Sequence, residues 1–61
     1  MRTHYEIKIA SNRKQWYFVL RAGNGEVIAT SELYNTKQAL RKGIRSMRFN
    51  AAIAYIEDKT V

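Results

Sequence analysis

The sequence predicts an α+β domain of the order β-β-β-α-β, in which one helix packs on an antiparallel sheet. Two stretches with alternating apolar side chains, 4–10 and 15–22, predict strands, because successive side chains of a strand point to opposite faces. Apolar side chains at helical spacing within 37–49 predict one helix with an apolar face. A chain of 61 residues has room for a single hydrophobic core, so residues 1–61 are predicted to form one domain.

The first predicted strand, residues 4–10, places Tyr5, Ile7 and Ile9 on one face and charged or polar side chains on the other. The polar run 11–14 follows, and its serine and asparagine side chains are acceptors that suit a tight turn. The chain is therefore expected to reverse direction there and to return as the second strand.

In the second predicted strand, residues 15–22, the side chains of Trp16, Phe18 and Leu20 share one face. The Gly-Asn-Gly sequence at 23–25 follows and is the strongest turn signal in the chain. These two features predict a hairpin that leads into a third strand. Such a hairpin is only marginally stable alone, so the first strand and the helix must support it.

The length of the hairpin loop decides which side chains of the third strand share the face of Leu20. A two-residue loop would place Val27 and Ala29 on that face. A three-residue loop, with its second glycine in a left-handed bulge, would place Ile28 and Thr30 there. We favour the three-residue loop because it buries the larger isoleucine side chain.

The helix is predicted to span about residues 36–49. Thr36 suits the N-cap, with Asn35 as the alternative, and Asn50 suits a left-handed C-cap. The glycine at position 43 lies beside the apolar stripe, which indicates a close approach between helix and sheet. Three side chains form that stripe and are expected to be buried against the sheet: Leu40, Ile44 and Met47.

A short link, 51–52, is predicted to follow the helix and to lead into a fourth short strand. The strand should pair with a second copy of the chain, because so small a core leaves sheet edges and apolar surface uncovered. The chain has no cysteine and one histidine, so disulfides and multi-histidine metal sites are not expected to stabilise it. The predicted dimer-forming residues are Ile53, Ala54, Tyr55, Ile56 and Glu57.

Three segments carry a resemblance to a known family: Leu20–Glu26 (LRAGNGE), Gly43-Ile44-x-Ser46, and Ile56-Glu57-Asp58. They resemble the YegP-like proteins, a group of small bacterial domains of unknown function with one or two copies of the unit. The resemblance implies that this single copy forms a homodimer, shares one sheet with its partner and exchanges C-terminal strands. It implies no known activity.

The charge suggests a second, different function. The net charge is +6, and the predicted helix contains no acidic residue. A basic surface of this kind favours contact with polyanions, although a solvated basic surface is the simpler interpretation. The hypothesis is weak, sequence-independent binding of nucleic acid. Its candidate contacts are Lys37, Arg41, Lys42, Arg45 and Arg48 on the helix, with Tyr17 and Arg21 on an exposed sheet face.

The remaining side chains show no pattern typical of catalysis. His4 and Glu6 share a strand face, but a solvated pair is the more common arrangement, and the serines lack the context of an activated nucleophile. We therefore expect no catalytic residue, no metal site, no cofactor and no enzymatic activity. No apolar run approaches the roughly 20 residues of a membrane span, so a cytoplasmic protein is expected.

Overall fold

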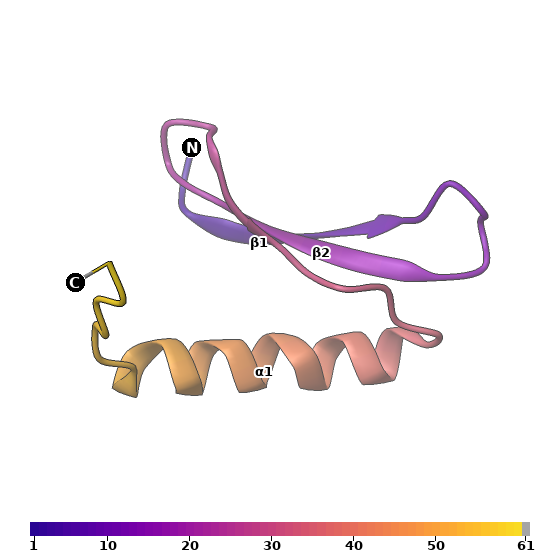
Figure 1. The fold of residues 1–61 in the computed structure, drawn as a ribbon. Coiled ribbons are helices and arrows are strands. Elements are labelled where there is room, and N and C mark those ends of the chain that lie inside the picture. The colour runs from indigo at the N-terminus through magenta and orange to yellow at the C-terminus, as the bar shows by residue number, and fades with distance from the viewer. Residues whose placement is uncertain (61) are drawn as a thin grey trace.

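The computed structural model describes residues 1–60 and confirms an α+β fold with one antiparallel sheet and one helix (Figure 1). The sheet has the strand order β1-β2-β3, and the helix lies across one of its faces. The elements are β1 (His4–Ile9), β2 (Trp16–Arg21), β3 (Val27–Thr30) and α1 (Lys37–Ile53).

Strands β1 and β2 pair in continuous register over six residues, as their alternating side chains predict. Ile7 lies opposite Phe18, and Tyr5 lies opposite Leu20, so the apolar side chains of both strands share one face. The rings of Tyr5 and Phe18 meet edge to face with their centroids 5.8 Å apart. This pairing fixes the apolar face of the sheet, on which α1 packs mainly against β2.

The hairpin between β2 and β3 has the predicted three-residue loop. The Gly25 amide donates to the Ala22 carbonyl at 2.9 Å, and the Ala22 amide donates to the Glu26 carbonyl at 2.8 Å. Gly25 has a φ of 92°, a left-handed conformation that glycine adopts without steric cost. A three-residue loop with a glycine bulge is therefore confirmed.

The expected position of the β3 side chains was wrong, because β3 contains a second bulge. This bulge adds Ile28 to the strand, so Leu20 lies opposite Ala29, and Thr30 lies opposite Val19. The side chain of Ile28 is 58% exposed instead of buried. An extra residue in one strand shifts every later residue to the other face.

After β3 the chain stays beside β2 without forming a regular strand. The Ser31 amide donates to the Phe18 carbonyl, and the Ser31 hydroxyl accepts from the Phe18 amide, both at 2.9 Å. Tyr34 and Trp16 exchange two backbone hydrogen bonds, of 2.7 and 2.9 Å. The linker therefore provides hydrogen-bond partners for the backbone of β2 on this side. It also places Tyr34 between the sheet and the helix.

Helix α1 begins as predicted but ends one turn later. Thr36 has extended dihedral angles, and its hydroxyl accepts from the Ala39 amide at 3.0 Å, which confirms it as the N-cap. The prediction that Asn50 ends the helix was wrong, because its side-chain amide donates to the Ser46 carbonyl at 2.8 Å and the helix continues. The predicted link 51–52 lies inside the helix, as expected for two alanines.

The core lies between β2 and the first half of α1. Leu40 is fully buried, and Phe18 on the facing strand is almost fully buried. The ring of Tyr34 stacks on Phe18, with ring centroids 6.3 Å apart and an interplanar angle of 19°. A Cβ atom at Gly43 would lie 2.7 Å from Cζ of Tyr34. A close approach at Gly43 is therefore present, but its partner is the ring of Tyr34 in the linker after β3 and not, as predicted, a strand of the sheet.

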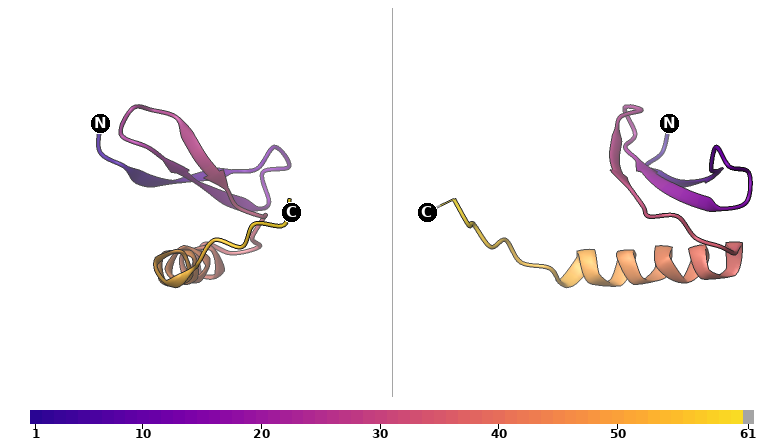
Figure 2. Two further views of the ribbon diagram at one scale, coloured as in Figure 1. Left: turned by 60° about the vertical axis from the view of Figure 1, so that its left-hand side comes forward. Right: turned by 45° about the vertical axis from the view of Figure 1, so that its right-hand side comes forward.

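The second half of α1 extends past the sheet. A helix of 17 residues is about 26 Å long, whereas a six-residue strand spans about 20 Å. Figure 2 shows the residues after the helix leading away from the sheet, and the molecule measures 41 × 25 × 21 Å along its principal axes. The predicted fourth strand does not form within this one chain: Ile53 ends the helix, and residues 54–60 have no regular structure.

Candidate functional site

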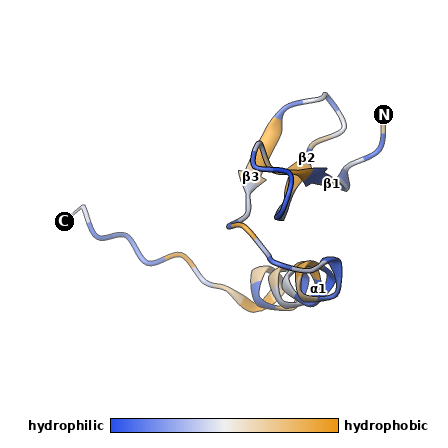
Figure 3. Ribbon diagram, turned by 90° about the vertical axis from the view of Figure 1, so that its right-hand side faces the viewer, coloured by the Kyte–Doolittle hydropathy of each residue, from blue (hydrophilic) through white to orange (hydrophobic). Residues whose placement is uncertain are grey.

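The main candidate surface is the C-terminal segment, residues 54–60, together with the end of α1. Its large apolar side chains are exposed: Phe49 to 66%, Ile53 to 64%, Tyr55 to 81% and Ile56 to 95%. Figure 3 shows an apolar stretch of this segment well away from the sheet. Large apolar side chains exposed in one continuous region are typical of a protein interaction site.

The alternation at 53–57 predicted part of this surface. Phe49 was not predicted to belong to it; it lies four residues before Ile53 and therefore on the same side of the extended helix. The signal was present, since two alanines follow Asn50 and favour a longer helix.

A second exposed apolar region lies on β1. Ile7 and Ile9 point to the same side of the sheet as Phe18, yet both are exposed. The reason is that α1 packs against β2 and leaves the helix-side face of β1 largely uncovered. The helix of a single chain therefore covers only part of the apolar face of that chain's sheet.

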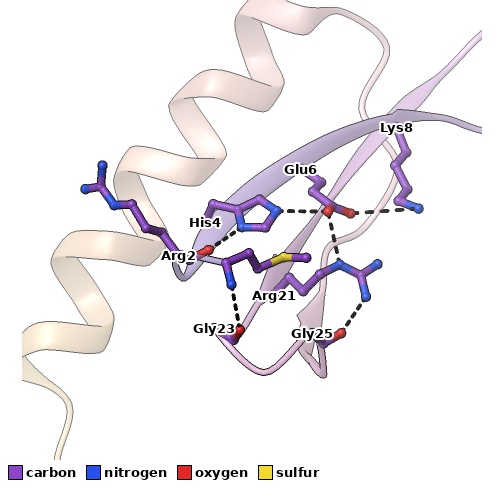
Figure 4. A network of polar contacts seen from close by, with 8 residues as sticks. Arg2, His4, Glu6, Lys8, Arg21, Gly23 and Gly25 are labelled. Atoms are coloured by element: carbon purple, nitrogen blue, oxygen red, sulfur yellow. Dashed lines mark hydrogen bonds and ion pairs between the residues drawn. The ribbon is translucent and has the colours of Figure 1, made fainter.

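The other face of the sheet carries a charged cluster centred on Glu6 (Figure 4). Nε2 of His4 lies 2.9 Å from the Glu6 carboxylate, and Nε of Arg21 donates to the same oxygen at 3.0 Å. Nζ of Lys8 is 3.9 Å from the second oxygen. Arg21 also donates to the Gly25 carbonyl at 2.7 Å, so the cluster connects both strands of the first pair to the hairpin loop.

These contacts shift two ionisation equilibria in opposite directions. A hydrogen bond between the His4 ring and the Arg2 carbonyl, followed by the one with Glu6, raises the pKa of His4 above its ordinary value. Hydrogen bonds from His4 and then Arg21 lower the pKa of Glu6. The expected His4–Glu6 pair is thus present, and both partners favour their charged forms.

The basic side chains of α1 form an exposed face. Within residues 1–60, none of them makes an ion pair with an acidic side chain. An open depression of about 380 Å³ is lined by Arg45, Arg48 and Phe49, and another of about 310 Å³ adds Arg41 and Ile44 to the two arginines. The exposed cations of the predicted set are Lys37, Arg41, Lys42, Arg45 and Arg48.

The structure does not bring all predicted nucleic-acid contacts together. Tyr17 and Arg21 alternate with Phe18, so they face away from the helix, on the opposite side of the sheet. Arg21 is also held by Glu6. The predicted set is therefore divided between two separate surfaces, and binding of nucleic acid stays a prediction.

Residues 1–60 contain no group of three or more His, Asp or Glu side chains that could hold a metal ion. Their one helix is too short and too polar to cross a membrane.

The fold and its surfaces define a small α+β unit, a three-stranded antiparallel sheet with one covering helix and an exposed apolar C-terminal region. The chain belongs to the family described as a domain of unknown function (DUF1508), which matches residues 11–58. The resemblance to YegP-like proteins is thereby confirmed. No specific activity is indicated for this family.

Two curated relatives illustrate the similarity. The UPF0339 protein plu2779 of Photorhabdus laumondii is 58% identical over 48 residues, which are 79% of this chain and 41% of the relative. The UPF0339 protein YegP of Escherichia coli is 56% identical over 41 residues, 67% of this chain and 37% of the relative. The chain therefore spans about two fifths of the length of the curated relatives that it matches.

A solved structure has the same fold. The NMR solution structure of a protein from Haloferax volcanii matches with a TM-score of 0.82 at 28% sequence identity. The match covers 93% of this chain and 95% of that one. This similarity extends over the helix and sheet together.

Proposed function

We propose that this chain is a non-enzymatic interaction module that works as a homodimer, with the C-terminal segment of each copy paired to the other. The observation that carries the proposal is the exposure of Tyr55 and Ile56, at 81% and 95%, in a segment that leaves its own sheet. Burial of such side chains against an apolar surface is favourable because it removes apolar area from water.

The energetics of a small core support the proposal. Among residues 1–60, Leu40 is the one large side chain that is fully buried. Burying a large apolar side chain contributes about 1.5–3 kcal/mol, so covering the four exposed residues at the helix end and tail would add substantially to a marginal fold. A partner chain is a common way to stabilise a scaffold of this size.

The length of the relatives gives independent support. Because the chain spans about two fifths of those proteins, each relative has room for a second unit of this size. Two units joined in one relative would correspond to two copies of this chain.

The absence of cysteine fits a reducing compartment, and we place the module in the cytoplasm on that basis.

In this proposal the pairing segment begins at Ala54, because Ile53 belongs to the helix and the backbone of Ala54 is extended. The apolar side chains at the helix end would then cover the junction between the two copies. The proposed contact residues are Phe49, Ile53, Ala54, Tyr55, Ile56 and Glu57.

Light scattering tests the proposal. The full chain at micromolar concentration is expected to have twice the mass of one copy, and a chain ending at Ile53 is expected to be a monomer. As a matched pair, Ile56→Asp should dissociate the dimer, whereas Gln38→Asp should leave it intact because Gln38 is exposed in the first turn of α1, away from the proposed contact residues. A monomeric full chain, or a dimer that survives loss of residues 54–61, contradicts the proposal.

A further inference from the structure

We infer that the basic face of α1 binds an acidic segment of another protein, with Arg41, Arg45 and Arg48 as the anion contacts. The site is the open depression of about 310 Å³ that is lined by these three arginines and Ile44. The partner differs from a second copy of the chain, and none of the proposed homodimer contacts belongs to this site. The homodimer and the acidic partner are therefore independent of each other.

The three arginines form one row along the helix. Positions i, i+4 and i+7 lie on the same side of a helix, and the row extends about 10 Å along the axis. All three side chains are exposed. Like charges at this spacing repel one another, and α1 contains no acidic residue that would reduce the repulsion. An anion bound along the row would remove this unfavourable interaction.

Contacts within the chain do not account for the row. Among residues 1–60, the arginine side chain that makes ion pairs and hydrogen bonds is that of Arg21 on the sheet, and the three arginines of the row make none. The helix dipole favours cations in the last turn of a helix, but α1 continues to Ile53 and its last turn contains no basic residue. The guanidinium groups of the row are therefore available to an external anion.

The lining of the depression favours a protein segment over a nucleic acid. A guanidinium group can donate two parallel hydrogen bonds to one carboxylate. Ile44 is half-buried, and it lies three residues after Arg41 and four before Arg48, so it adjoins both. Proteins that bind single strands stack the bases on aromatic side chains, whereas isoleucine offers only an aliphatic contact. A segment with carboxylates on either side of an apolar side chain matches both parts of the site.

A neighbouring depression makes nucleic acid the alternative to be tested. It measures about 380 Å³ and shares Arg45 and Arg48, but its apolar side chain is Phe49. An aromatic ring beside two arginines could hold a base and its phosphates. Because Phe49 is also a proposed homodimer contact, we place the site for the acidic partner on the side of Ile44.

Fluorescence anisotropy at physiological salt tests the inference on the full chain. The probe is a fluorescein-labelled peptide of three Glu-Leu-Glu-Gly repeats. Arg45→Gln with Arg48→Gln should weaken its binding about tenfold, because two exposed ion pairs are lost. Arg13→Asn with Lys14→Gln removes the same charge from the exposed turn between β1 and β2, and asparagine tolerates the positive φ of Arg13. This control should change the affinity less than about twofold, because distant exposed charges are screened.

Two further probes separate the possible partners. A peptide with glycine in place of each leucine keeps the charge and should bind several-fold more weakly, because it lacks the apolar contact. A thymidine oligonucleotide of equal charge should also bind more weakly than the first peptide. Tighter binding of the oligonucleotide overturns the choice of a protein partner.

The remaining outcomes concern the site itself. Absence of peptide binding, or equal binding by the wild type and the arginine variant, overturns the assignment. The arginine variant should be at least as stable as the wild type in urea melts, because it relieves repulsion along the row, so weaker binding would not reflect unfolding. Light scattering of the wild type reports separately on the proposed homodimer, and a monomer that still binds the peptide would contradict only the homodimer.

Discussion

At the scale of single residues, Tyr34 shows how one side chain connects the sheet to the helix. Its ring stacks on Phe18 from the sheet and reaches Gly43 in the middle of α1. Glycine inside a helix costs about 1 kcal/mol relative to alanine. That cost is offset because the missing side chain leaves room for an aromatic ring that extends the core.

The first prediction concerns this contact. Gly43→Ala gains about 1 kcal/mol of helix propensity, but its methyl group would overlap the Tyr34 ring, and overpacking of this kind costs about 1–3 kcal/mol. We expect a net loss of stability in urea melts. In a Tyr34→Leu background, the same change should raise stability instead. A stabilising Gly43→Ala in the wild-type background would contradict the proposed role of the ring.

The second prediction concerns pH. The raised pKa of His4 makes its contribution to stability complete below pH 6.5, and the contribution is lost as the pH rises through the higher folded-state pKa. The lowered pKa of Glu6 makes its contribution present above pH 4.5, and it is lost as the pH falls through the lower folded-state pKa. Both contributions to stability are therefore fully present between pH 4.5 and 6.5.

His4 is the single histidine, so its NMR titration reads this equilibrium directly. We expect a folded-state pKa above 6.5. The stability difference between wild type and His4→Gln should shrink as the pH rises past that value. Glu6→Gln should move the His4 pKa downward while leaving the bond to the Arg2 carbonyl. A histidine that titrates at or below 6.5 in the folded protein would refute the assignment.

At the scale of elements, the two halves of α1 have different surroundings. Its first half buries Leu40 against β2, whereas its last turns extend past the sheet with Phe49 and Ile53 exposed. One continuous helix therefore packs on its own sheet and also holds the C-terminal segment away from it. This arrangement separates the part of the chain that builds the monomer core from the part proposed to meet a partner.

The third prediction follows from this division. Leu40→Ala removes a fully buried side chain and should cost about 2–5 kcal/mol, enough to unfold most of so small a domain. Ile44→Ala should cost less, about 1–2 kcal/mol, because Ile44 is half-buried. Urea melts of the two variants check the order. A nearly neutral Leu40→Ala, or a larger loss at Ile44, would show that the helix packs differently.

At the scale of the whole molecule, charge is distributed unevenly. The helix carries an exposed basic face without acidic partners among residues 1–60, while the cations on the far sheet face surround Glu6. A polyanion would therefore meet the helix face first. Its exposed cations can reach phosphates, and phosphate contacts alone do not distinguish one base from another.

The fourth prediction is that any nucleic-acid binding is weak and independent of sequence. Raising salt from about 50 to about 200 mM should remove most of it, because such affinity comes from counterion release. In fluorescence anisotropy, Arg45→Gln with Arg48→Gln should weaken binding, whereas Tyr17→Ala on the opposite side should not. Discrimination between sequences at physiological salt would instead indicate a specific binding function.

Part of the fold and of the candidate site could be predicted from the sequence. The alternation in β1 and β2, the glycine at position 25 and the cap at Thr36 depend on side-chain spacing and on backbone preferences within a few residues. The apolar residues after the helix were also visible as a pattern. Short-range preferences of this kind can be predicted from the local sequence alone.

The tertiary structure decided the features that depend on distant partners. The bulge at Ile28 changes which side chains face the helix, and only pairing along β2 reveals it. The cluster around Glu6 needs Arg21, fifteen residues away, and the fit at Gly43 needs Tyr34. These contacts exist because the sheet and helix bring separate segments together, and pairing register is set by the whole sheet rather than by the local sequence.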